Sequence, residues 1–172
     1  MRAARLFVAA VPPAAVLDRV AALSRPEVEG LRWTSRDQWH VTLRFLGRVT
    51  DVDAVLAALE PVALPQREAR LGPETGRFGR RVLHVPVTGL DDVAAAVEAA
   101  TADVGAPPED RPFAAHLTLA RARARRGIDL RALTGTAIAA RWTVDDVCLI
   151  ESHLHPHGAR YELLQRVRTM EP

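Results

Sequence analysis

The sequence contains no lysine, so its 23 basic residues are all arginine, against 21 acidic residues. A P-loop needs a lysine on the phosphates, and Schiff-base chemistry and nucleotidyl-lysine ligation both need the amine. These three kinds of chemistry are therefore excluded. The formal net charge is only +2, which argues against a broad surface that coats nucleic acid. Arginine's planar guanidinium suits phosphate, so a local basic cleft remains open.

Cysteine is almost as scarce, with Cys148 as the single example. One cysteine cannot form an internal disulfide, which favours a reducing compartment and predicts a cytoplasmic protein. Its neighbours Val147, Leu149 and Ile150 are aliphatic. We therefore expect Cys148 to be a small core residue and not a nucleophile.

Long hydrophobic runs are also absent. The apolar stretch at residues 6–11 meets Pro12, Pro13 and then Asp18, so it is too short to direct export or to span a membrane. With 172 residues and 48% hydrophobic residues, the chain can bury a sizeable core. We expect a globular monomer, residues 1–172 forming one domain, with no membrane partner.

What the sequence does have is a near-repeat, His40-Val41-Thr42-Leu43 and His116-Leu117-Thr118-Leu119, one copy in each half. Alternate side chains of a strand share a face, so each copy puts a histidine and a threonine on one surface and two aliphatic residues on the other. An ordinary half-buried strand can also read this way. Two copies at matching places favour function instead, namely acid–base chemistry by two imidazoles that converge on a small anion.

The remaining pattern predicts an α+β protein. Helices are expected at residues 13–23, from a cap at Asp51 or Asp53 to Pro61, and at 90–104. Strands are expected at residues 6–11, 39–46, 67–71, 82–87, 113–122, 144–154 and 160–167, with a short segment at 130–133. Because both halves run strand, helix and paired strands, we expect two intimately packed lobes in a pseudo-two-fold arrangement. Two antiparallel sheets would then face a central cleft, with the helices outside.

The duplicated motif resembles that of the 2H phosphoesterase superfamily. More narrowly, four stretches are similar to the bacterial and archaeal RNA 2′,3′-cyclic phosphodiesterases, also called 2′-5′ RNA ligases. They are residues 5–9, 40–47, 113–121 and the tail at 150–163. Ala114 and Ala115 depart from this pattern, because the family usually carries a proline and often an arginine there. The resemblance implies hydrolysis of a 2′,3′-cyclic phosphate at an RNA end or on a nucleotide, with possible reverse 2′-5′ ligation that needs no ATP.

Two histidines suffice for that chemistry, because one can activate water while the other protonates the departing oxygen near neutral pH. The resemblance assigns His40 as the general acid and His116 as the general base, and the pseudo-symmetry leaves the opposite assignment open. Thr42 and Thr118 would donate hydrogen bonds to the non-bridging phosphate oxygens. No metal and no cofactor is required.

Three further residues are candidate substrate contacts. Arg121 matches a family position that contacts phosphate, yet its strand parity is opposite to that of His116, so it reaches the site only if the strand ends or bulges near Ala120. Arg44 shares the parity of His40 and needs no such distortion. Phe7 resembles a family aromatic that stacks on a base, although a core phenylalanine is an equally good account.

The other histidines carry less weight. His153, His155 and His157 would align as metal ligands only on a continuous strand, and Pro156 with Gly158 predicts a turn instead. His84 is expected on a strand as a structural residue with its hydrogen bonds satisfied. An alternative of a different class is a non-catalytic module that binds RNA ends. Within the enzyme class, tRNA halves, other RNA ends, cyclic nucleotides and ADP-ribose cyclic phosphate all remain possible substrates.

Overall fold

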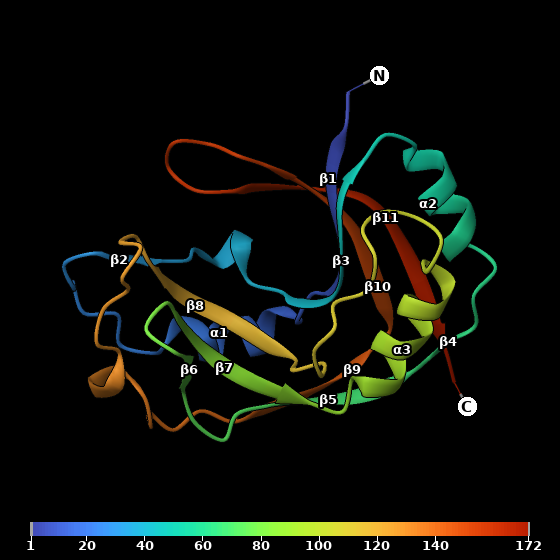
Figure 1. Ribbon diagram of the computed structural model, residues 1–172. Coiled ribbons are helices and arrows are strands. Elements are labelled where there is room, and N and C mark those ends of the chain that lie inside the picture. Colours follow the sequence, from blue (N-terminus) through green and yellow to red (C-terminus); the bar gives the residue numbers. More distant parts are fainter. Residues whose placement is uncertain (1, 172) are drawn as a thin grey trace.

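A computed structural model describes residues 2–171, over which three α-helices lie against one large sheet (Figure 1). The helices are α1 (Ala14–Ala21), α2 (Val52–Leu59) and α3 (Asp91–Ala100). Two short 3-10 helices, η1 (Arg36–Gln38) and η2 (Arg131–Leu133), interrupt the loops. None of the described helices is long and apolar enough to cross a membrane.

Within residues 2–171 the sheet has 11 strands, and its main path runs β4, β11, β10, β1, β3, β8, β7, β5, β9, with β2 paired to β8 and β6 to β7. The strands are β1 (Ala4–Ala10), β2 (Leu31–Trp33), β3 (Val41–Val49), β4 (Leu64–Pro65), β5 (Arg67–Leu71), β6 (Gly76–Phe78), β7 (Val82–Thr88), β8 (His116–Ala122), β9 (Ala140–Val144), β10 (Asp146–His153) and β11 (Arg160–Met170). The α+β class expected from the sequence is confirmed. The two expected sheets are joined edge to edge where β3 meets β8.

One large core lies under both halves. It contains alternate residues of the central strands, such as Leu6 and Val8 on β1, Val41 on β3, Leu117 on β8 and Val85 on β7, all without solvent exposure. Helices α2 and α3 pack together beside β3 and β4, and α1 packs against β9 (Figure 1). Burial of this apolar surface is the main stabilising term of the fold. The opposite face of β1 and β10 carries a smaller buried cluster of Phe7, Ala9, Cys148 and Ile150.

Local chemistry explains where the helices begin and end. Helix α1 starts directly after Pro13, and α2 is capped by Asp51, whose side chain accepts a hydrogen bond of 3.0 Å from Ala54 N. Helix α3 stops earlier than expected, at Ala100, because the chain then turns and Ala106 N donates to Leu46 O of β3.

The sequence missed four short strands, β2, β4, β6 and β9. Strands β2, β4 and β9 pair with segments distant in the chain, whereas β6 forms a hairpin with β7. The strand expected at 39–46 was also too short at its C-terminal end. Strand β3 continues to Val49, because Leu46 forms a bulge against β1 and Gly47 adopts a positive φ of 68° there. Glycine takes this backbone conformation without steric cost. The expected strand at 113–122 begins only at His116.

Candidate active site

The two repeated motifs lie side by side in antiparallel strands. Val41 of β3 and Leu117 of β8, which directly follow the two motif histidines, are Cα partners. Both are fully buried in the large core. Because side chains alternate along a strand, the flanking residues His40, Thr42 and their counterparts in the second motif share the opposite face. The structure therefore brings together the two histidine–threonine pairs that the sequence singled out.

Each motif imidazole is held by the same backbone contact. His40 Nδ1 lies 2.8 Å from Gln38 O, and His116 Nδ1 lies 2.8 Å from Ala114 O. A carbonyl only accepts, so each Nδ1 carries a proton and each Nε2 is the basic atom of the neutral ring. His40 Nε2 lies 3.1 Å from Thr42 Oγ1. Both rings thus keep Nε2 for proton transfer.

Gln38 is itself fixed from two sides. Its Oε1 accepts a 3.0 Å hydrogen bond from Ser35 N, as in a capping box at the start of η1, and its Nε2 donates to Ala159 O at 2.7 Å. The β10–β11 turn is thereby tied to the segment that leads into β3. Gln38 O is held in place for the His40 ring, a role that the sequence did not suggest.

Arg44 does not lie with the motif residues. In the β1–β3 pairing, Ala9 lies opposite Thr42 and Val8 lies opposite Arg44, so Leu43 has no partner and forms a bulge. After this bulge the side chains of β3 point to the face opposite to the one that strict alternation predicts. Arg44 is 4% exposed, and its Nη2 donates to Ala106 O at 2.7 Å on the core side of the sheet. The expectation that Arg44 contacts substrate, which depended on strict alternation, is wrong.

A corresponding bulge on β8 brings the Arg121 side chain to the face that carries the motif histidines and threonines. In the β7–β8 pairing His84 faces Thr118 but Leu83 faces Ala120, so Leu119 is bulged. Arg121, opposite Val82, then shares the face of Thr118 and is exposed. This is the bulge near Ala120 that the position required.

Thr34 stabilises this bulge. Its backbone N donates to Leu119 O at 2.8 Å, and its Oγ1 lies 2.8 Å from Thr118 O. Trp39, which precedes the first motif, donates from Nε1 to Thr34 Oγ1 at 2.9 Å. The carbonyls that the bulge removes from the sheet are therefore paired, as buried backbone groups must be.

Aromatic side chains surround each histidine. The Phe7 ring lies 4.8 Å from His40, and Tyr161 of β11 lies 5.2 Å from both rings in edge-on contact. Phe7 is only 5% exposed, so it packs beneath His40 and has little free surface for a base. Of the two accounts open from the sequence, the structure favours the core one for Phe7.

The second histidine has a matching set of neighbours that sequence reasoning missed. Phe78 of β6 meets His116 edge-on at 4.8 Å and stacks on His84 at 4.1 Å, and the His84 and His116 rings are 5.4 Å apart. Phe78 is 41% exposed. The register between β7 and β8 places His84 opposite Thr118. The sequence alone does not reveal this contact, because it does not show which strands pair or in what register.

Burial and positive charge favour the neutral form of these imidazoles. Burial lowers the pKa of His40 to about 4, assisted by the charges of Arg121 and His116 and opposed by the hydrogen bond to Gln38. Burial also lowers the pKa of His116, with Arg121 and Arg111 acting in the same direction. Arg121 therefore acts on both rings, which agrees with its place on the motif face.

His84 is on strand β7 as expected, but its hydrogen bonds are not satisfied. Its side chain is 6% exposed, and within the described chain Nδ1 is buried without a partner. Burial and the neighbouring His116 lower the pKa of His84 to about 4. Protonation of the buried His84 ring is energetically unfavourable. Because His84 packs against His116, it also limits where the His116 ring can move.

The histidines near residue 155 do not form one ligand set. His153 ends β10, whereas His155 and His157 lie in the turn before β11, as Pro156 and Gly158 predicted. A different group, Glu151, His153 and Glu162, brings its ligand atoms within 4.8 Å of one another. Here His153 Nε2 lies 3.1 Å from Glu162 Oε2, and Arg2 binds Glu151 at 2.8 Å. An ion-pair network accounts for this cluster.

Cys148 lies in a small buried cluster with Phe7, Ala9 and Ile150. It has no solvent exposure, and burial raises the pKa of its thiol to about 11. A thiol that stays protonated at neutral pH is a poor nucleophile. Cys148 is a core residue, as the sequence predicted.

Comparison with known proteins identifies this fold and motif pair. A family model of the 2′-5′ RNA ligase superfamily matches residues 12–156. TT0787 of Thermus thermophilus is 26% identical with a TM-score of 0.76, over 95% of this chain and 97% of that one. E. coli LigT, solved in complex with 3′-AMP, is 23% identical with a TM-score of 0.74, over 97% and 98% of the two chains. No protein of curated function matches the sequence.

A more distant structure is the phosphodiesterase (PDE) domain of MHV ns2, which is 10% identical with a TM-score of 0.53, over 96% of this chain and all of that one. These likenesses show the fold, and the paired histidine–threonine motifs define the class, the two-histidine phosphoesterases. The chain belongs to the 2′-5′ RNA ligase superfamily within that class.

Proposed function

We propose that the protein hydrolyses 2′,3′-cyclic phosphates at RNA ends or on nucleotides, leaving a 2′-phosphomonoester, without a metal ion. The observation that carries the proposal is the antiparallel pairing of Val41 with Leu117, which sets two imidazoles on one face with both Nδ1 atoms fixed. E. coli LigT was solved with 3′-AMP, which supports a nucleotide ligand for the same fold.

The proposed step is a direct displacement at phosphorus. His116 Nε2 accepts a proton from water as the water oxygen bonds to phosphorus. The bond from phosphorus to the 3′ oxygen breaks, and His40 Nε2 gives its proton to that oxygen. His116 ends protonated and His40 neutral, and exchange with solvent resets both. Thr42 and Thr118 donate to the non-bridging oxygens, and Arg121 compensates the charge that grows on them.

The lowered pKa values favour uptake of a proton by the acid as substrate binds. In the free protein burial favours the neutral form of both rings. An anionic phosphate between them favours a protonated imidazole, and so offsets the effect of Arg121 on His40. Substrate binding and protonation of the acid are therefore coupled.

The same groups run backwards would join a 2′,3′-cyclic phosphate to a 5′-hydroxyl, which makes 2′-5′ ligation without ATP a reverse activity. Hydrolysis is the proposed physiological direction because water is abundant. Phe7 is retained as a support for His40 and Arg44 is not part of the proposed site. The single cysteine supports a cytoplasmic location, and we propose a monomer acting on tRNA or other RNA ends.

The test is hydrolysis of a 2′,3′-cyclic nucleotide by the purified protein in EDTA. Release of the 2′-phosphomonoester by the wild type, with a loss of about 10²-fold to 10⁴-fold in His40→Ala and His116→Ala, supports the proposal. His155→Ala is the matched control, since this exposed histidine lies in the β10–β11 turn. Unchanged substrate with retained binding would instead support a non-catalytic module for RNA ends.

A further inference from the structure

Positive charge is concentrated at one end of the molecule, next to the candidate site. Six arginines lie on the β6–β7 hairpin and on the loop after β8, and we call them the arginine strip: Arg77, Arg80, Arg81, Arg123, Arg125 and Arg126. The two segments together contain one acidic residue, Asp129, although the net charge of the whole chain is only +2. The rest of the protein is therefore net negative, and the strip is a local asymmetry of charge.

The two segments of the strip are locked against each other by backbone contacts. Arg80 O accepts a hydrogen bond of 2.9 Å from Ile128 N, and Arg81 O accepts one of 2.8 Å from Ala122 N. Gly127 has a φ of +66°, and a Cβ added there would lie 2.2 Å from Arg80 O. Only glycine permits this approach. The strip is thus a fixed surface and not two independent loops.

Its guanidinium groups are not neutralised. Arg80 Nε and Arg81 Nη1 donate to the carbonyls of Arg126 and Arg125, at 3.3 and 2.9 Å. A carbonyl uses one of the five donors of a guanidinium and leaves the charge uncompensated. Among residues 2–171, none of the six arginines forms an ion pair, and all six are exposed.

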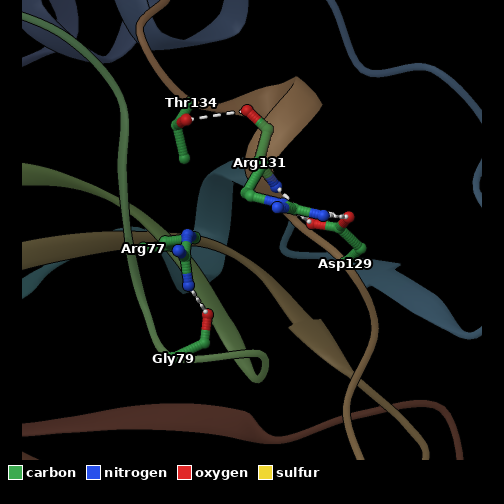
Figure 2. A network of polar contacts seen from close by, with 5 residues as sticks. All are labelled: Arg77, Gly79, Asp129, Arg131 and Thr134. Atoms are coloured by element: carbon green, nitrogen blue, oxygen red, sulfur yellow. Dashed lines mark hydrogen bonds and ion pairs between the residues drawn. The ribbon is translucent and has the colours of Figure 1, made fainter.

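Asp129, the one carboxylate of these two segments, is already paired. Figure 2 shows Asp129 paired with Arg131, with Arg131 Nη2 2.7 Å from Asp129 Oδ2, while Arg77 donates to Gly79 O at 2.8 Å. The Arg131 side chain holds the pKa of Asp129 well below its usual range. Asp129 is therefore committed to its neighbour in the chain, and the strip is free to bind an external anion.

The strip is continuous with the candidate site. Strand β8 begins at His116, brings Arg121 onto the motif face and runs directly into Arg123. The hairpin carries Phe78, which touches the His116 ring and lies shortly before Arg80 in the chain. In Figure 1 the β6–β7 hairpin lies beside the end of β8, away from α2 and α3. An RNA strand that leaves His116 toward this end would pass over the arginines.

We propose that the arginine strip binds the phosphodiester backbone of an RNA strand whose terminal phosphate occupies the histidine site, so that the preferred substrate is polymeric RNA and not a mononucleotide. This inference rests on the proposed function. Guanidinium forks match phosphate oxygens, and regularly repeated phosphates suit a row of them. An acidic protein could bind the strip without also reaching the histidine site. Because the strip is continuous with that site, RNA is the favoured ligand.

The test compares two substrates in one variant. Arg123→Gln, Arg125→Gln and Arg126→Gln are combined, because these side chains make no hydrogen bond in the part of the chain that the structure describes. The control combines Arg19→Gln, Arg141→Gln and Arg168→Gln, three exposed arginines on α1, β9 and β11. The substrates are an RNA oligonucleotide with a 2′,3′-cyclic phosphate end and a cyclic mononucleotide.

In the strip variant, kcat/KM for the RNA is expected to fall by about tenfold or more while that for the mononucleotide stays within about twofold. The slope of log(kcat/KM) for RNA against log salt should become shallower by about 2, since each lost phosphate contact contributes about 0.7. The control variant should match the wild type on both substrates. An equal loss on both substrates, or no loss on RNA, overturns the proposal.

If the wild type hydrolyses neither substrate, the proposed function fails and the strip is still tested by binding. Fluorescence anisotropy with the same RNA ending in a hydroxyl should show weaker binding to the strip variant than to the control. Equal binding to both overturns the strip as an RNA surface. Polyglutamate that competes as well as RNA of equal charge would also overturn it, because the surface would then be a general polyanion site.

Discussion

Phe45 on β3 and Arg121 on β8 occupy equivalent places, each just past the bulge that follows a motif. Phe45 faces Phe7 across β1 and β3, and Arg121 faces Val82 across β7 and β8. At this position the first half has the apolar ring of Phe45 and the second half has the cation of Arg121. The Arg5 guanidinium lies 5.3 Å from the centroid of the Phe45 ring. The near-symmetry of the histidine–threonine pairs is broken here, which gives the two histidines different surroundings.

Arg121→Gln is expected to lower kcat/KM on a 2′,3′-cyclic nucleotide by about 10²-fold, because the growing phosphate charge loses its cation. Arg121 is exposed, so the melting temperature should not change. Steady-state kinetics and thermal unfolding check both statements. Arg121→Lys should recover part of the rate, and full activity in the glutamine variant would remove Arg121 from the site.

Arg44→Met should show the opposite pattern. The buried guanidinium donates to Ala106 O and lies 3.4 Å from Thr101 Oγ1, and its removal leaves these groups without their partner. We expect a loss of about 1–3 kcal/mol in the free energy of unfolding, measured with urea, and little change in kcat/KM. A large loss of activity in a stably folded variant would contradict the core-side placement.

The pH dependence of kcat/KM is expected to be a bell centred below pH 6.5. The active form needs one protonated and one neutral imidazole, and the pKa values of both His40 and His116 are lowered in the free protein. The rate should therefore fall as pH rises through and above 6.5. The bell for kcat should lie at higher pH, because the bound anion raises both pKa values.

The same profile has an internal control. Arg121→Gln removes a cation that lowers the pKa of both histidines, so its residual kcat/KM profile should shift toward higher pH. Initial rates measured from about pH 4 to 9, spanning the ordinary imidazole pKa, give both curves. A profile with a single limb would show that paired acid and base do not operate.

Stability should decline in acid through the same imidazoles. The pKa of His84 and that of His40 are about 4 in the folded protein, below the ordinary 6.5. Their contribution is complete above pH 6.5 and is lost as pH falls toward 4, because the unfolded chain then binds more protons. His84→Leu should reduce the drop in melting temperature between pH 7 and pH 5.

His84→Gln, which keeps a polar group but does not titrate, serves as a second variant in the same thermal scans. It should also flatten the pH dependence, but start from a lower melting temperature because a buried polar group remains unpaired. A wild-type dependence that survives both substitutions would show that His84 does not contribute to it.

Thr34→Val tests the bulge at Leu119. Loss of the hydroxyl leaves Thr118 O and Trp39 Nε1 without their partner, and we expect a cost of about 1 kcal/mol in stability. Since the bulge turns Arg121 toward the site, kcat/KM should fall as well. Thr34→Ser keeps the hydroxyl and should restore both values toward the wild type; failure of the serine to do so would assign the effect to lost packing.

The parts of the site that the sequence revealed are those carried by local pattern. The two motifs, the α+β class and a helix cap at Asp51 or Asp53 are each readable from residue type and spacing, and the core role of Cys148 from its aliphatic neighbours. Arg44 was misplaced for a physical reason. Alternation predicts direction only while the strand is regular, and the bulge at Leu43 depends on its pairing with β1.

The residues that were missed are placed by distant partners. Tyr161 reaches His40 from β11, and Phe78 reaches His116 from β6. No short-range signal marks either one, because their positions depend on which strands pair and in what register. Gln38 carries a local signal in its spacing from Ser35, a capping-box pattern that was available in the sequence.

The bulge at Leu119 has a consequence for related chains. The bulge puts two residues between Thr118 and Arg121 where a regular strand would need one for both side chains to lie on the same face. A relative that lacks this extra residue would keep a regular strand and still aim its arginine outward. A relative that keeps the residue but straightens the strand would bury that cation in hydrocarbon. Homologues can therefore conserve the arginine in space while an ungapped alignment displaces it by one column.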